Sequence, residues 1–106
     1  MYYSSVFKKF AKLDGSQHIA SEHALKGVEN IVGRFSVKSV FELGTGIGTI
    51  PYLVKSISKE IKYVGIEDNE FCVKALYRNL EEFVNNNFEI FNSTIAFNNN
   101  LKFRSY

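Results

Sequence analysis

The chain has 106 residues, of which 45% are hydrophobic and 23% charged, and its net charge is +2. This length allows one domain with a real core, and the charge is too small to indicate a nucleic-acid partner by itself. The single cysteine, Cys72, excludes an intrachain disulfide. No apolar run reaches the roughly 18 residues that a membrane span needs, and the first residues lack the pattern of a signal peptide. The composition therefore predicts a cytoplasmic globular domain.

Two amphipathic helices are predicted at the N-terminus. In the first, residues 3–13, apolar side chains occupy one face and lysines the other. The second is predicted from about Gln17 or Glu22 to Val32. Gly33 follows where a left-handed C-cap is needed, because glycine has no Cβ to clash there.

Strands and helices then alternate along the chain. In order, the spacing of apolar residues predicts a buried strand at 39–43, a helix at about 50–57, a strand at 62–67, a helix from about 69 to 84 and a weaker strand at 88–91. This alternation is typical of a parallel sheet with helices packed on it. The fold class is therefore α/β, a parallel sheet with flanking helices, preceded by N-terminal helices.

The most informative stretch is Phe41-Glu42-Leu43-Gly44-Thr45-Gly46-Ile47-Gly48. A glycine-rich turn between a strand and a helix lets the backbone approach a ligand, and the N–H groups at the helix start face that ligand. In a doubly wound sheet such a turn lies at the carboxyl ends of the strands, where ligands bind. Dinucleotide sites commonly read G-x-G-x-x-G. Here the third glycine comes one residue early, and an acid, Glu42, precedes the loop.

A second acid ends the second predicted strand. Glu67 lies about twenty residues past the loop, the distance at which an acid meets ribose hydroxyls in folds of this kind. A carboxylate accepts two such hydrogen bonds well. Asp68 follows Glu67 directly.

Residues 38–92 resemble the N-terminal, cofactor-binding portion of class I S-adenosylmethionine-dependent methyltransferases. Residues 41–48 resemble the first motif of that family, acid-x-G-x-G-x-G, and residues 63–68 resemble the second. The resemblance implies a Rossmann-like sheet and S-adenosyl-L-methionine as the cofactor. It places Glu42 near the methionine amino group and Glu67 on the ribose.

The remaining cofactor-binding residues also follow from the resemblance. They are Gly44, Thr45, Gly46 and Gly48 of the loop, Asp68 beside Glu67, and Asn92 and Ser93 after the third strand. Many members of the family have an acid near the adenine amino group after that strand. Here Asn92 or Ser93 could form the hydrogen bond to adenine instead.

The sheet is expected to be truncated after about three strands, because the chain stops near where the family's fourth strand would begin. That region usually supplies the acceptor and catalytic residues, so both stay unidentified. We divide the chain into an N-terminal helical segment, 1–36, and a partial Rossmann-like domain, 37–106. The first strand should then have an open edge, which a second copy, another polypeptide or the tail 101–106 would cover.

Two other functions stay open at this point. The chain could be a non-catalytic or partner-dependent S-adenosylmethionine-binding module, or a nicotinamide-dinucleotide-binding Rossmann domain, although the loop spacing disfavours the latter. His18 and Glu22 would lie one turn apart on a helix, but His23 faces elsewhere and no third ligand is evident, so no metal site is predicted. Either histidine could serve as an acid or base for an acceptor. Cys72 is interpreted as a small buried hydrophobe.

Overall fold

A computed structural model describes residues 1–84 and 87–91 of the chain. Its elements are α1 (Tyr3–Ala11), the short 3-10 helix η1 (Ser16–His18), α2 (Glu22–Arg34), β1 (Ser39–Leu43), α3 (Thr49–Ile57), β2 (Lys62–Ile66), α4 (Glu70–Asn79) and β3 (Phe88–Phe91). In this part of the chain the sheet has three parallel strands in the order β1-β2-β3. The predicted α/β fold, a short Rossmann-like parallel sheet preceded by helices, is confirmed.

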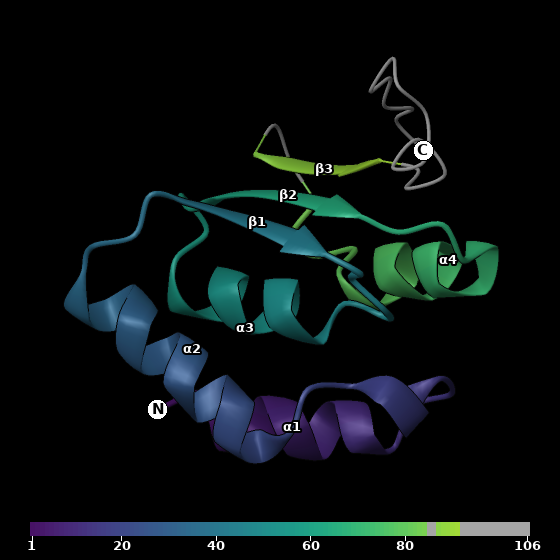
Figure 1. The fold of residues 1–106 in the computed structure, drawn as a ribbon, viewed down its shortest axis with the longest axis horizontal. Helices are drawn as coiled ribbons and strands as arrows, with labels where there is room; N and C mark the ends of the chain where they lie inside the picture. Colours follow the sequence, from purple (N-terminus) through teal and green to yellow (C-terminus); the bar gives the residue numbers. More distant parts are fainter. Residues whose placement is uncertain (85–86, 92–106) are drawn as a thin grey trace.

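The helices α1 to α4 all lie on one side of the sheet (Figure 1). On that side the strands contribute Tyr63, Phe88 and Ile90, which are almost completely buried. On the opposite side Phe41 is 61% exposed and Leu43 is 74% exposed. The prediction that residues 39–43 form a buried strand is therefore wrong: Val40 and Glu42 are half-buried and the other residues of β1 are exposed, because the described residues place no helix over the opposite face.

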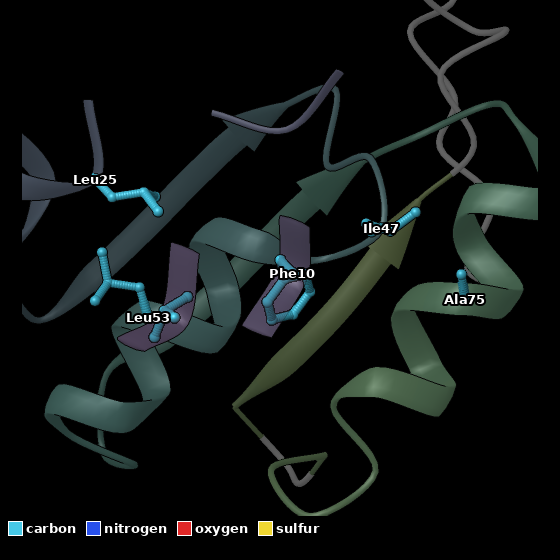
Figure 2. Close-up of a cluster of buried hydrophobic side chains, with 6 residues drawn as sticks. Phe10, Leu25, Ile47, Leu53 and Ala75 are labelled. Carbon is cyan, nitrogen blue, oxygen red and sulfur yellow. The ribbon is translucent and has the colours of Figure 1, made fainter. Parts of the chain in front are cut away.

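One hydrophobic cluster joins the N-terminal helices to the sheet-bearing part of the chain (Figure 2). Phe10 and Leu25 come from α1 and α2, Leu53 from α3 and Ala75 from α4, and Ile47 comes from the glycine loop. The core thus spans both predicted segments, 1–36 and 37–106, and their division into domains stays a prediction. Because Ile47 is buried in this cluster, the core holds the loop in place.

Side-chain caps fix where two helices begin. Ser21 accepts a hydrogen bond from the backbone N–H of Ala24 at the start of α2. Asn69 accepts one from the backbone N–H of Cys72 at the start of α4. Such caps pair backbone donors that have no partner within the helix. No helix in the described residues is long and apolar enough to cross a membrane.

Two predicted helix ends were wrong. Gly33 lies inside α2, which continues to Arg34, so it is not the C-cap; one glycine near a helix end costs only about 1 kcal/mol. The helix α4 stops at Asn79 rather than near residue 84. The chain turns there, and Phe83 packs edge-on against Tyr52, with ring centroids 5.2 Å apart. Tertiary packing therefore overrides the helical spacing of the apolar residues.

A buried lysine ties the end of α3 to the start of β2. The Lys55 ammonium donates hydrogen bonds to the backbone carbonyls of Lys59 and Ile61. Burial lowers the pKa of this lysine, and a cation near a helix C-terminus is favourable. This contact fixes where β2 begins, and so helps to place Glu67 at its other end.

Candidate functional site

The glycine loop joins β1 to α3 at the carboxyl ends of the strands. Gly44, Gly46 and Gly48 have φ angles of 80°, 55° and 101°, a region that favours glycine. A Cβ at Gly44 or Gly46 would meet nothing within 4 Å, whereas one at Gly48 would lie 2.5 Å from Leu80 and 3.1 Å from Leu76. The first two glycines therefore face open space, and the third allows the loop to pack closely on α4.

A hollow of about 100 Å³ lies beside the loop. Four of the predicted cofactor-binding residues line it: Glu42, Gly44, Thr45 and Gly46. The opposite wall comes from Gly15 and residues 18–20, in and around η1, which the sequence analysis did not place at the site. A larger open hollow of about 560 Å³ adjoins the first and shares Gly15, His18 and Cys72 with it.

Glu67 connects the loop to α4. One carboxylate oxygen accepts a hydrogen bond from the backbone N–H of Gly46 at 2.8 Å, and the other accepts one from the backbone N–H of Asn69 at 3.0 Å. Because a carboxylate has about four acceptor positions, two of them are left for hydroxyl groups of a ligand. Glu67 can thus hold the loop and bind a ligand at the same time.

Glu42 belongs to a second contact beneath the loop. The hydroxyl of Tyr63, on β2, donates a hydrogen bond to the Glu42 carboxylate. Glu42 lies opposite Gly65 in the register of β1 and β2. A Cβ at Gly65 would lie 2.3 Å from the methyl group of Thr45 and 2.8 Å from the Tyr63 hydroxyl. The contact between Tyr63 and Glu42 therefore depends on a glycine at position 65.

Two acids without a basic partner give the site its electrostatic character. Burial raises the pKa of Glu42 to about 7; the hydrogen bond from Tyr63 acts against this shift, and the charge of Glu67 adds to it. Burial, and then the charge of Glu42, raises the pKa of Tyr63. Within residues 1–84 and 87–91, neither acid forms an ion pair with a lysine or arginine. Such a site suits a ligand that carries positive charge and hydroxyl groups.

Thr45 and the predicted site residues that do not line the hollow lie in different surroundings. Gly48 is buried against α4 and is not among the residues that line the first hollow. Thr45 is buried, and its hydroxyl donates to the backbone carbonyl of Gly46. Asp68 is exposed. Asn92 and Ser93 lie outside the described residues, so their predicted contact with adenine stays a prediction.

No three histidine, cysteine or acidic side chains come together as a metal site in the part of the chain that the structure describes. His18 instead lines both hollows. Cys72 is only partly buried and also lines both, so the expectation of a simple buried hydrophobe does not describe its position.

Two solved structures that share this fold are described as methyltransferases. A proposed caffeoyl-CoA O-methyltransferase from Staphylococcus aureus matches 88% of the chain with a TM-score of 0.74 and 26% identity. A proposed RNA methyltransferase from Pyrococcus horikoshii matches 91% of it with a TM-score of 0.69 and 18% identity. The chain has the Rossmann-like fold of class I methyltransferases. It spans 44% and 52% of the lengths of these two structures.

No protein-family model matches the sequence, and no curated protein sequence matches it significantly. The methyltransferase resemblance is therefore supported by the three-dimensional fold and by the short motifs at Glu42 and Glu67.

Sequence reasoning missed Tyr63 and Gly65 as parts of this candidate site. One signal could have found them. Residues 63 and 65 lie on the same face of a strand, and a glycine within a strand often marks a close approach of another group. Here the approaching groups are the Tyr63 hydroxyl and the methyl group of Thr45.

Proposed function

We propose that the chain binds S-adenosyl-L-methionine as the cofactor-binding part of a methyltransferase whose acceptor is unidentified. The main support is the combination of an open glycine loop with two acids, Glu42 and Glu67, on a fold shared with methyltransferases. This cofactor carries an ammonium group, a carboxylate, a sulfonium and ribose hydroxyls. The site has groups complementary to the ammonium group, to the carboxylate and to the ribose hydroxyls.

The amino-acid end of the cofactor suits the smaller hollow. Glu42 would face the ammonium group. The N–H groups at the start of α3, where Thr49 and Ile50 line the hollow, suit a carboxylate because first-turn donors have no intrahelical partner. The hollow is smaller than the roughly 300–1,000 Å³ typical of a complete ligand pocket. Only one end of the cofactor would therefore enter it, with the ribose toward Glu67.

The bound cofactor would supply a methyl carbon that an acceptor attacks directly, so that the sulfonium leaves as a neutral thioether. The residues of this chain would bind and orient the cofactor. Alignment of this kind supplies a large part of the rate acceleration in reactions between two molecules. Catalytic residues and the acceptor stay unassigned.

One alternative has an observation in its favour. Because the chain spans about half of the two similar structures, it could act as a binding module that needs a partner for methyl transfer. Binding and transfer must therefore be measured separately. Binding of S-adenosylmethionine without methyl transfer to any acceptor would favour this alternative. A nicotinamide dinucleotide site would show neither S-adenosylmethionine binding nor methyl transfer.

Isothermal titration calorimetry should detect S-adenosylmethionine and its demethylated product S-adenosylhomocysteine binding with dissociation constants of roughly micromolar size. NAD should give no heat, because the loop lacks the G-x-G-x-x-G spacing that accommodates a pyrophosphate and the Glu42 carboxyl lies in the wall beside it. Heat with NAD but with neither methionine derivative would contradict the proposed function.

Glu67→Ala is expected to weaken cofactor binding by about 1–3 kcal/mol, the cost of leaving buried polar groups unpaired. It should also lower the free energy of unfolding, because the N–H groups of Gly46 and Asn69 lose their acceptor. Glu67→Gln should lose less, since its amide oxygen still accepts one of these bonds. Calorimetry and thermal melts measure the two effects.

The matched control is Glu89→Gln, which changes an exposed acid on β3 and should alter neither quantity. If both Glu67 variants bind the cofactor like the wild type, Glu67 is not the ribose ligand, and Asp68 becomes the candidate.

A further inference from the structure

Tyr63 is the most deeply buried polar side chain at the site. Its ring has no exposed surface and stacks on Phe88, with centroids 5.3 Å apart. A phenylalanine ring at position 63 would satisfy the packing alone. A buried tyrosine hydroxyl needs a hydrogen-bond partner, and here that partner is the Glu42 carboxylate in the wall of the hollow.

Gly65 leaves space for the hydrogen bond between Tyr63 and Glu42. Tyr63 lies opposite Val40 in the strand register, two residues before the Glu42–Gly65 pair. Its side chain must therefore extend along the sheet, past position 65, to reach Glu42. A Cβ there would lie 2.8 Å from the hydroxyl. In the local sequence Tyr63-Val64-Gly65, the glycine thus leaves space for the Tyr63 side chain to extend from the core to Glu42 beside the loop.

We propose that Tyr63 is a positioning residue which holds the Glu42 carboxyl at the hollow, and that Glu42 releases a proton to solvent when the ammonium end of the cofactor binds. The inference rests on the proposed function. The O–H bond of the Glu42 carboxyl breaks, the proton goes to the buffer, and the ligand keeps its own ammonium protons. No other bond changes.

The direction of the pH dependence follows from burial. The pKa of Glu42 is raised to about 7 by burial, against the hydrogen bond from Tyr63 and with a further rise from Glu67. A cation bound next to the carboxyl favours its charged form and so lowers this pKa. Below pH 7 the empty site holds the proton and binding expels it. Above pH 7 the carboxyl is already ionised, so affinity should stop rising with pH.

Other titratable groups lie in or near the same hollow: Cys72 and His18 line it, whereas Glu67 does not. Glu67, at the end of β2, already accepts two backbone hydrogen bonds. Burial raises the pKa of the Cys72 thiol on α4, which keeps it neutral at neutral pH. The residues from α3, Thr49 and Ile50, carry no charge. His18 also lines the hollow, so it needs a variant of its own.

Calorimetry of S-adenosylmethionine binding at pH 6 and pH 8, in two buffers with different ionisation enthalpies, counts the protons released. The wild type should release close to one proton at pH 6, and its affinity should fall by up to about tenfold per pH unit below 7. Glu42→Gln should lose this release and this part of the pH dependence. His18→Gln should keep both. The difference between wild type and Glu42→Gln removes any contribution from the ligand's own amine.

Tyr63→Phe removes the hydrogen bond that favours the Glu42 carboxylate. The pKa of Glu42 should rise further, so the midpoint of the affinity curve should move to higher pH. Tyr77→Phe is the matched control, because Tyr77 packs on Phe88 from α4 and does not line the hollow; its midpoint should stay in place. In the wild-type protein, the ring resonances of Tyr63 and the carboxyl resonance of Glu42 should shift with one common midpoint, which tests the coupling even if Tyr63→Phe does not fold.

The ligand provides a further control. Methylthioadenosine lacks the amino-acid end and should bind without releasing the proton. Binding of S-adenosylmethionine with no proton release at pH 6, or with equal release by Glu42→Gln, would overturn the inference while leaving the proposed function intact. An unmoved midpoint in folded Tyr63→Phe would overturn the role of Tyr63. No binding at any pH would contradict the proposed function and the inference together.

Discussion

Replacement of Gly46 by valine is expected to abolish binding of S-adenosylmethionine while most of the fold survives. The backbone at Gly46 has a φ of 55°, and a Cβ there would meet nothing within 4 Å. The added side chain would thus enter open space at the hollow, where the cofactor is proposed to lie. We expect affinity to fall at least about 100-fold, or roughly 3 kcal/mol.

The loss of stability should be smaller than the loss of binding. A residue with a Cβ in the left-handed region costs about 1–2 kcal/mol, and a β-branched side chain is disfavoured there. Circular dichroism and a thermal melt measure this cost, and calorimetry measures binding. Gly27→Val is the matched control, because Gly27 lies in α2, has open space around it and does not line the hollow.

Gly27→Val should bind the cofactor like the wild type. An unchanged affinity in Gly46→Val would show that the loop does not touch the ligand. A collapsed fold in Gly46→Val would show instead that this glycine is needed for the loop conformation.

Most of the elements could be predicted because local signals decide them. The helical spacing of apolar residues over 50–57 identifies α3 as a helix that faces the core. Two of these residues, Leu53 and Val54, are fully buried. Short apolar segments of suitable length mark the three strands, and their alternation with helices predicts parallel pairing. The positions of Glu42 and Glu67 near the glycine loop could be predicted for the same reason, since Glu42 lies one residue before the end of β1 and Glu67 directly follows β2.

The remaining features depend on contacts between segments that are far apart in the sequence. Nothing in the sequence of Gly15 and residues 18–20 indicates that they form the wall opposite the glycine loop, because that depends on how α1 packs on α3. The hydrogen bond between Tyr63 and Glu42 spans two strands and requires the register of the sheet. The apolar sequence of β1 does not reveal which of its faces a helix covers.

The isolated chain is expected to associate with a second copy of itself through β1. Among the described strands, β1 pairs only with β2, so its other edge offers backbone N–H and C=O groups that no described strand pairs. Phe41 and Leu43 are both mostly exposed next to that edge. An exposed apolar edge is a template for another strand. A second copy offers the same edge, so a closed dimer about a two-fold axis would satisfy both.

Light scattering over a range of concentrations should show the mass rising above that of a monomer. The double variant Phe41→Lys/Leu43→Lys should stay monomeric, because charges on an edge strand oppose pairing. Ile31→Lys/Phe35→Lys is the matched control. It removes two exposed apolar residues at the end of α2, outside the β1 strand, and should associate like the wild type.

Hydrogen exchange at the backbone amides of Phe41 and Leu43 distinguishes the other occupants of this edge. Gly44 donates its N–H to Ile66 on the β2 side, so the alternating amides of Phe41 and Leu43 point toward the open edge. A dimer should protect these amides only at high concentration. A monomer with protected amides would mean that the chain covers its own edge, and the tail 101–106, which lies outside the described residues, would be the first segment to delete. A stable monomer with a cooperative melt and rapid exchange at the amides of Phe41 and Leu43 would contradict the expected association, because an uncovered apolar edge would then be compatible with a soluble, folded chain.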